Sequence, residues 1–193
     1  MTRQISRGTC TFCHRELSKG SMTRHLESCE QRTAVQGEIE SRQKAKKIKA
    51  FHLVVEGYRL PMYWMHLQVA VDTTLETLDR FLRDTWLECC GHLSVFRIGG
   101  FNYYVEEETD AYYYWDERRK NMQVKLEEVF SPGQTCSYEY DFGSTTELTL
   151  KVIFRTRSRS GEGDSGACQK YPANSSLRCV RKTCYPSLYS MHL

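Results

Sequence analysis

Three cysteines and a histidine near the N-terminus have the spacing of a metal site. Cys10, Cys13, His25 and Cys29 form the pattern C-x2-C-x11-H-x3-C. The two thiols of the first half would lie on a tight turn, and a histidine and a cysteine four residues apart share one face of a helix. Three sulfur ligands and one imidazole suit tetrahedral Zn²⁺, and four protein ligands leave no open position for catalysis. The spacing therefore predicts one structural zinc ion, held by a C2HC finger within residues 1–32.

The second half of this finger needs a helix to carry His25 and Cys29. Ser18 is a suitable N-cap for a helix that ends near Cys29, and Leu17 and Met22 would supply the apolar core. A module of this size buries too little apolar surface to fold alone, so zinc would supply most of its folding free energy. The alternative is that these thiols occur by coincidence in a disordered arm.

Basic residues outnumber acidic ones in residues 1–50, although the net charge of the whole chain is only +3. In a finger that reads DNA, the outward helix positions would be Ser18, Ser21 and Arg24. Residues 33–50 form a basic linker that would attract phosphates, although such a run is also typical of a solvated linker. Single fingers also bind proteins, so both kinds of partner stay open. The residues assigned to DNA or RNA are Arg15, Lys19, Arg24, Arg42, Lys44, Lys46, Lys47 and Lys49.

The stretch from Cys136 to Phe154 shows the clearest strand pattern. Apolar residues occupy the even positions on both sides of a Gly143-Ser144 turn, which predicts a hairpin with one buried face that includes Phe142 and Phe154. A lone hairpin is not stable, so further strands are needed. We expect them at residues 51–58, 63–71 and 92–98.

A helix is expected between the second and third of these strands. Thr73 and Glu76 form a capping box, and apolar residues follow at helical spacing up to Trp86, so the helix should span about 74–89. It can lie across the sheet and bury the apolar face. The fold class predicted for residues 51–155 is α+β, with a mainly antiparallel sheet covered by one principal helix.

Two short motifs in this region carry a family resemblance. Phe96–Gly100 (FRIGG) and Tyr138–Gly143 (YEYDFG), in this order of elements, resemble the plasmid pRiA4b ORF-3-like family, which is also described as similar to the TnpR passenger protein of an insertion element. The resemblance implies an α+β fold and an association with plasmids or mobile elements, without an established activity. Many members continue with an aspartate, a tryptophan and a histidine, but this chain has 144–147 (STTE) there.

Residues 101–117 combine aromatic and acidic side chains. The rings could stack on bases or hold a cation, but the acids would repel a phosphate backbone, which favours simple packing of the rings on the sheet. An enzyme acting at the surface from Tyr103 to Trp115 would use Glu139, Asp141 and His66 as acids or bases. The sequence has no nucleophile elbow, phosphate loop or paired-carboxylate motif, so we do not expect catalysis.

Residues 156–193 lack periodicity and predict a flexible, disordered tail. Cys168, Cys179 and Cys184 make a poor zinc pattern. Relatives often continue into a second cysteine-rich segment, and the residues from Arg178 onward can be back-translated so that a shift of one base spells such a segment. We therefore consider the hypothesis of a frame-shifted tail, which the nucleotide sequence of the gene would test.

The length and composition of the chain limit the classes of protein to which it can belong. A chain of 193 residues allows one core and a small accessory module. No run approaches the ~18 apolar residues of a membrane span, and no apolar stretch follows the first residues. Nine cysteines, an odd number, favour free thiols and metal ligands over disulfides. We expect a cytoplasmic, non-catalytic, zinc-containing binding protein that contacts DNA, RNA or another protein and no membrane.

Overall fold

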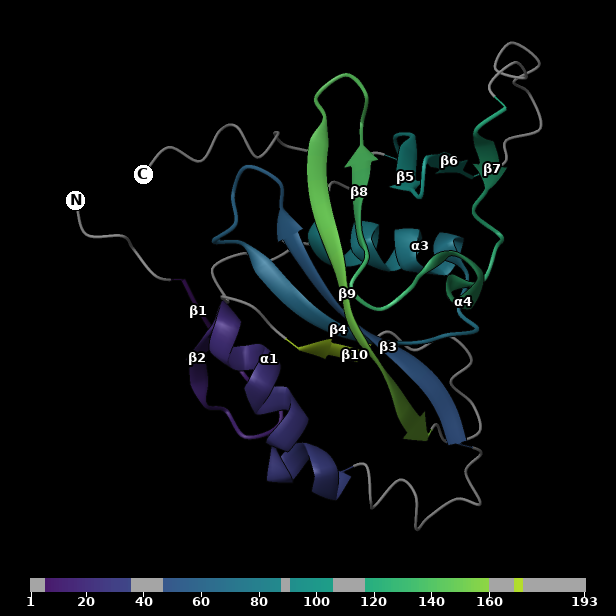
Figure 1. The fold of residues 1–193 in the computed structure, drawn as a ribbon. Helices are drawn as coiled ribbons and strands as arrows, with labels where there is room; N and C mark the ends of the chain where they lie inside the picture. The colour runs from purple at the N-terminus through teal and green to yellow at the C-terminus, as the bar shows by residue number, and fades with distance from the viewer. Residues whose placement is uncertain (1–5, 36–46, 88–90, 106–116, 160–168, 172–193) are drawn as a thin grey trace.

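The computed structural model describes residues 6–35, 47–87, 91–105, 117–159 and 169–171. The chain is a mixed α+β protein built on one large sheet with the strand order β10-β4-β3-β9-β8-β5-β6-β7 (Figure 1). Its neighbouring strands pair antiparallel except β6 and β7, which confirms the prediction of an α+β fold with a mainly antiparallel sheet. The strands are β3 (Lys47–Gly57), β4 (Trp64–Ala70), β5 (Ser94–Ile98), β6 (Phe101–Tyr104), β7 (Arg119–Asn121), β8 (Thr135–Tyr140), β9 (Thr146–Arg159) and β10 (Gln169–Tyr171).

The predicted hairpin is present as β8 and β9, and its two strands bury one common face. Tyr138 lies opposite Leu148, and Tyr140 and Leu150 belong to the same apolar core. Phe142 was expected on this face, and that prediction is wrong. Because β8 ends at Tyr140, Phe142 lies in the connecting turn, where its side chain is 48% exposed.

Phe154 was also expected on the buried face, and it lies on the other one. His52 of β3 pairs with Phe154, but the next residue, Leu53, pairs with Val152, so Ile153 is an extra residue. Such a bulge turns the following side chains to the opposite face of the strand. The ring of Phe154 therefore meets the ring of His52 edge-on, with the centroids 4.8 Å apart.

Helix α3 (Leu75–Trp86) covers the first face of the sheet. Its leucines Leu75, Leu78 and Leu82 are buried in the core that the hairpin also lines. The N-cap is Thr74, whose hydroxyl accepts a hydrogen bond from the amide of Thr77, so the capping box predicted at Thr73 is wrong by one residue. Thr73 lies just before this cap, and its carbonyl accepts a hydrogen bond from the amide of Leu126, the first residue of the short helix α4 (Leu126–Val129).

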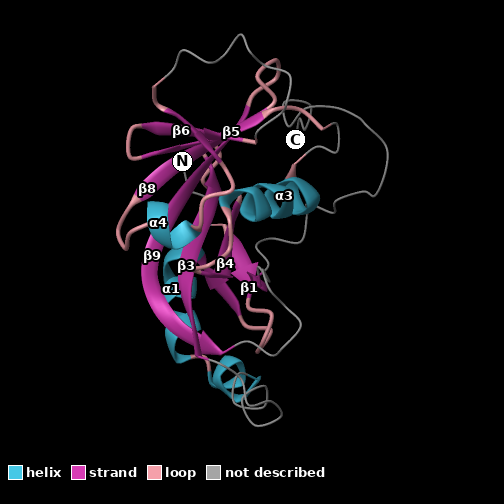
Figure 2. Cartoon of the chain, turned by 90° about the vertical axis from the view of Figure 1, so that its right-hand side faces the viewer, coloured by secondary structure: helices cyan, strands magenta, loops and turns pink. Residues whose placement is uncertain are grey.

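The N-terminal module consists of β1 (Arg7–Thr9), β2 (Glu16–Ser18) and α1 (Lys19–Ser28), and it lies on the second face of the sheet. Successive residues of β4 point to the two sides: Met65 enters the core under α3, and Trp64 enters a separate cluster with α1. Figure 2 shows α3 and α1 on opposite sides of the strands. Both faces of this part of the sheet are therefore covered.

Some predicted boundaries shift. β3 begins at Lys47, inside the segment predicted as a linker, and pairs there with the end of β9, which continues to Arg159. The end of β9, residues 155–159, has the sequence RTRSR, which contains no apolar residue and therefore shows no apolar alternation. The division into domains stays a prediction, and most of the predicted tail, with Cys168, Cys179 and Cys184, lies outside the described residues. Among the described helices, none is long and apolar enough to cross a membrane.

Candidate metal centre

The four residues predicted as metal ligands come together in the structure. One ligand atom from each of Cys10, Cys13, His25 and Cys29 lies within 4.8 Å of all the others. The sulfur of Cys13 is 3.2 Å from Nε2 of His25. This cluster of three thiols and one imidazole could hold a metal ion.

Local backbone geometry explains how the cluster forms. The amide of His14 donates to the carbonyl of Cys10, and the amide of Cys10 donates to the carbonyl of Arg15, which closes the turn between β1 and β2. His14 has φ 57°, a left-handed conformation that is uncommon outside glycine but allows a tight turn. Ser18 caps α1 as predicted, by accepting a hydrogen bond from the amide of Ser21, and α1 then carries His25 to the cluster.

The pKa values of the candidate ligands are shifted in different directions. Burial raises the pKa of the Cys10 thiol. Burial would also raise the pKa of Cys13, but hydrogen bonds from the Arg15 backbone, Cys10 and Cys29, together with the Arg15 charge, lower it. Burial and then the charge of Arg15 lower the pKa of His25. Cys13 and His25 are therefore biased toward the thiolate and the neutral imidazole, the forms that bind metals.

The apolar core of the module is completed by the sheet. Cys10, Met22, Leu26 and Cys29 are buried in one cluster with Trp64 of β4. The indole Nε1 of Trp64 donates to the hydroxyl of Ser6 over 2.8 Å. A module too small for a core of its own thus uses a tryptophan from the body of the protein.

Polar contacts surround this tryptophan. Lys19 at the start of α1 forms a salt bridge with Glu56 of β3, which also pairs with Lys151 over 3.3 Å. Burial would raise the pKa of Glu56, but Lys19 and Lys151 together lower it. Arg32 donates to the side chain of Gln68 over 2.9 Å. These bonds fix the orientation of the module on the sheet.

The model of a known family matches residues 49–170 and is described as plasmid pRiA4b ORF-3-like protein. The chain belongs to this family. A crystal structure of a protein of unknown function, MM3350 from Methanosarcina mazei Go1, is similar with a TM-score of 0.50 and 19% identity, over 64% of this chain and 69% of that chain. This likeness shows a shared fold. No curated protein matches the chain.

The cluster of three cysteines and one histidine lies outside residues 49–170, which match the pRiA4b ORF-3-like family. The surface of the sheet on which the N-terminal module docks lies inside the matched residues. Trp64 and Glu56 were not predicted as functional residues. The available signal was Trp64 itself, a large apolar side chain that alternation along residues 63–71 places on the opposite face from Met65 and Leu67.

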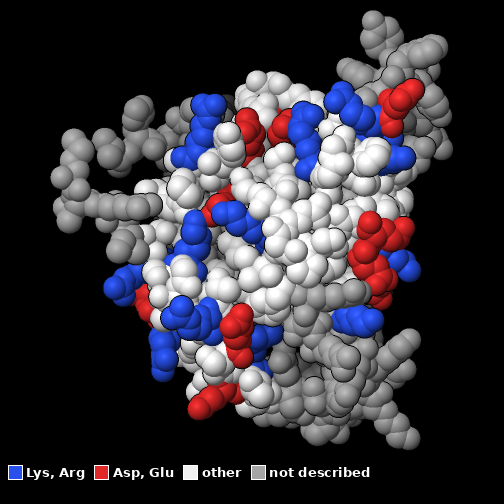
Figure 3. Space-filling model, viewed as in Figure 1, with Lys and Arg blue, Asp and Glu red and all other residues white. Residues whose placement is uncertain are grey.

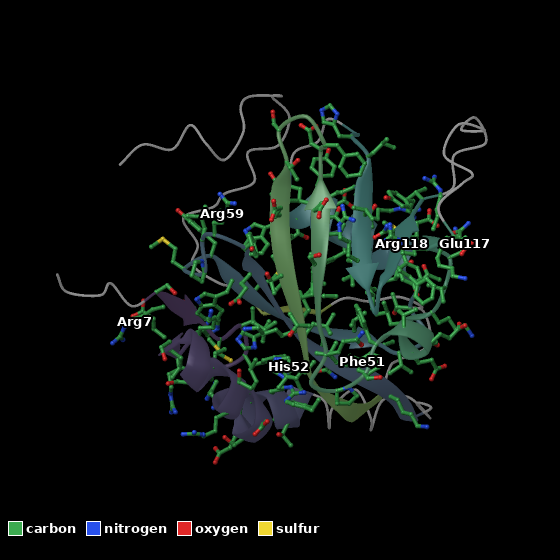
Figure 4. All side chains as sticks on the ribbon, turned by 45° about the horizontal axis from the view of Figure 1, so that its top comes forward. Arg7, Phe51, His52, Arg59, Glu117 and Arg118 are labelled. Carbon is green, nitrogen blue, oxygen red and sulfur yellow. The ribbon has the colours of Figure 1, made fainter. Side chains whose placement is uncertain are left out.

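Two histidines lie within the same docking face of this family member. Nε2 of His52 and Nδ1 of His66 are 2.8 Å apart, and the ring of His66 meets Trp64 edge-on at 5.4 Å. Figure 4 shows His52 on the side of the N-terminal module and its neighbour Phe51 on the side of α4. Burial, followed by the charge of Arg32 for His52 and of His52 for His66, lowers their pKa values to about 4 and about 3. Both rings are therefore neutral at pH 7.

The three residues considered for catalysis are not brought together. His66 is buried in β4, whereas Glu139 lies in β8 and Asp141 follows that strand. Between β4 and β8 stand β3 and β9, so these strands are three spacings of about 4.8 Å apart. Of the aromatic segment, residues 106–116 lie outside the described part, and Arg119 stands 4.4 Å over the ring of Tyr104.

The basic residues assigned to nucleic acid have different surroundings. The side chains of Arg15, Arg24 and Lys49 are exposed, but Lys19 is held by Glu56. On the face seen in Figure 3, basic side chains stand over the region of β1, β2 and α1, interspersed with acidic ones. Lys47 lies in β3, and Arg42, Lys44 and Lys46 lie outside the described residues.

Proposed function

We propose that this member of the pRiA4b ORF-3-like family is a non-catalytic binding protein stabilised by one structural Zn²⁺. The supporting observation is the cluster of Cys10, Cys13, His25 and Cys29, whose ligand atoms lie within 4.8 Å of one another. Cys10 and Cys29 are almost fully buried, and Cys13 and His25 are half-buried. Four protein ligands, which leave no position for a catalytic water, are typical of a structural zinc site.

Zinc also accounts for the buried thiols. Burial alone raises the pKa of Cys10, which disfavours the thiolate. A divalent cation reverses this preference because coordination deprotonates a thiol outright. Metal content of the purified protein tests this proposal: we expect one zinc per chain, and a metal-free protein with a folded α1 would contradict it.

We further propose that the partner is a nucleic acid, contacted through phosphates by the N-terminal basic residues. Arg15 and Arg24 project from the module, and Lys49 projects from the start of β3. An attraction of this kind releases counterions, so the affinity falls with rising salt. Association with plasmids or mobile elements belongs to the same proposal and is supported by the name of the family.

The test is binding of DNA and RNA by the full chain over a range of salt concentrations. Arg24→Gln should weaken binding on all sequences and reduce the slope of log affinity against log salt by about 0.7 to 0.9. Lys19→Gln is the matched control, since it removes the same charge from a residue that Glu56 already neutralises, and we expect a smaller effect. Binding that is absent, insensitive to salt or weakened equally by both substitutions would contradict the proposal.

A protein partner is the second candidate, and one observation favours it. The loop between β3 and β4 exposes Tyr58, Leu60 and Met62, of which Tyr58 is 57% exposed. Pro61 of this loop accepts a hydrogen bond from Lys19, so the loop borders the module. Exposed apolar groups of this size are typical of protein interaction sites.

The two candidates differ in what substitutions on this loop would do. If the partner is a protein, Leu60→Ser with Met62→Ser should abolish its capture, as should Cys13→Ser through loss of the metal. If the partner is a nucleic acid, the loop substitutions should leave binding unchanged. A captured protein that survives both changes would exclude the adaptor function.

A further inference from the structure

A cavity of about 660 Å³ lies between α3 and the strands β5, β6 and β8, away from the metal cluster. Charged residues of both signs line it together with a few apolar side chains. The charged ones are Glu76, Asp79, Arg80, Arg83, Arg97, Arg119 and Glu139.

The acidic groups of this cavity already have hydrogen-bond donors. Asp79 accepts from Ser94 and Tyr138 on one oxygen and from Arg83 on the other. Both oxygens of Glu139 accept from Arg97. Glu76 accepts from Arg80 on one oxygen and from Gln123 on the other. Each carboxylate oxygen is therefore engaged within the protein.

Two of the guanidinium groups, those of Arg80 and Arg97, do not use all their N–H donors in bonds to the described residues. A guanidinium has five N–H donors. Arg80 uses one nitrogen, in its bond to Glu76, and its side chain is 69% exposed. Arg97 bonds Glu139 with two nitrogens and Asn102 with the third, which leaves N–H groups on the outer nitrogens without a bond to any residue that the structure describes. The polar groups still able to bind a ligand are thus mainly positively charged donors.

An apolar rim borders the charged part. Leu93 and Phe142 line the cavity and are 45% and 48% exposed. Tyr104 and Val105 line the cavity as well. A ligand with an apolar or aromatic group would cover these side chains and gain from their removal from water.

We propose that the cavity binds a small organic anion, whose carboxylate or phosphate accepts hydrogen bonds from Arg80 and Arg97 and whose apolar part packs against Leu93 and Phe142. Charge-assisted hydrogen bonds of this kind are the strong ones, and arginine suits planar or tetrahedral oxyanions. This site is separate from the N-terminal basic residues, so its test does not depend on nucleic-acid binding.

The test uses phenyl phosphate and benzoate as probes, with phenol as the neutral analogue, in NMR titrations of the zinc-loaded full chain. We expect saturable shifts of the amides of residues 91–94 and 142–145 with at least one of the two anions, and none with phenol. The comparison of phenyl phosphate with benzoate identifies the preferred head group. Inorganic phosphate alone should bind more weakly, because it makes no contact with the apolar rim.

Three substitutions test whether the cavity is a binding site for anions. Arg80→Gln should weaken binding of the anion about tenfold, a change of about 1.4 kcal/mol, because it removes one charge-assisted hydrogen bond. Glu139→Gln should strengthen binding, because it frees Arg97 from its carboxylate partner. Arg59→Gln is the control. Arg59 lies in the loop between β3 and β4 and does not line the cavity, so its substitution should leave anion binding unchanged.

The outcomes are decisive in both directions. Weaker binding in Arg80→Gln together with stronger binding in Glu139→Gln supports the site. Absence of saturable shifts with both anions, equal binding of phenol, or affinity that neither substitution changes would overturn it.

Discussion

The two faces of the sheet are closed by different means. Under α3 lies a large apolar core in which Leu78 of the helix and Tyr138 of β8 are fully buried. On the other face the N-terminal module provides a small cluster around Trp64, surrounded by the buried polar side chains of His52, His66 and Gln68. The first face needs only the removal of apolar surface from water, whereas the second buries thiols and imidazoles.

This difference predicts which part of the protein a bound zinc ion would stabilise. A face closed by apolar burial can fold without a ligand, since apolar burial is the main favourable contribution to folding. Under our proposal of a structural zinc ion, the face that buries Cys10 and Cys29 needs this cation to stabilise their thiolates. We therefore expect the module and the α3 face to respond separately to substitutions.

The largest effect is expected from Cys10→Ser. Loss of one ligand should abolish zinc binding, whose free energy in zinc-finger peptides is about 10 to 16 kcal/mol, and should unfold the module. Hydrogen exchange resolved by segment is the measurement: α1 should lose protection and α3 should keep it. Cys136→Ser is the matched control, a buried cysteine under α3 whose pKa burial raises to about 12, and it should keep the zinc. Zinc retained in Cys10→Ser would refute the assignment.

On the other face, Leu78→Ala should lower the free energy of unfolding of the whole sheet by about 2 to 5 kcal/mol, because it leaves a cavity in the apolar core. Urea denaturation measures this loss. The zinc should stay bound until the sheet itself unfolds. Release of zinc well before the sheet unfolds would indicate that the packing of the module on Trp64 does not couple its unfolding to that of the sheet.

The histidine pair gives the second face a dependence on pH. Their pKa values of about 4 and about 3 lie below the ordinary 6.5, so the unfolded chain binds protons that the folded chain does not. The free energy of unfolding should therefore fall as the pH drops from 7 to about 4, by up to about 1.4 kcal/mol per pH unit for each histidine.

Denaturation at a series of pH values tests this dependence. The double variant His52→Gln, His66→Gln should show a shallower fall than the wild type. The metal ligands titrate in both proteins, so the difference between the two curves isolates the pair. Parallel curves would contradict the neutral, buried state of these rings.

The smallest effect concerns the contact between the module and Trp64. A Cβ added at Gly8 would lie 2.6 Å from the indole ring, whereas one added at Gly20 meets nothing within 4 Å. Gly8→Ala should thus destabilise the module by about 1 to 3 kcal/mol through overpacking. Gly20→Ala, within α1, should stabilise it by up to about 1 kcal/mol. Zinc affinity measured by competition with a chelator would report both changes, and equal affinities would argue against close docking on Trp64.

The parts predicted well from the sequence are those set by local pattern. The alternation in β8 and β9, the Ser18 cap and the spacing from Cys10 to Cys29 each depend on residues close in the chain. The motifs at Phe96–Gly100 and Tyr138–Gly143 predicted the family, which the match to residues 49–170 confirms.

The missed features depend on residues far apart in the chain. The bulge at Ile153 is set by pairing with β3, a hundred residues earlier in the sequence, and no local signal announces it. The docking of the module on Trp64 and the pairing of Lys19 with Glu56 also join residues that are far apart in the sequence, so no local pattern predicts them. The cavity beside Arg80 and Arg97 combines helix α3 with strands and loops that follow it in the sequence, up to residue 145, so its lining could not be read from one motif.

The most direct test of the account is the indole N–H of Trp64 in a zinc titration of the metal-free protein. With zinc bound, we expect this proton, which Trp64 donates to Ser6, to exchange slowly with solvent, and after zinc removal to exchange fast while the amides of β8 stay protected. An indole proton whose exchange is the same with and without zinc would contradict the claim that the metal closes the second face of the sheet.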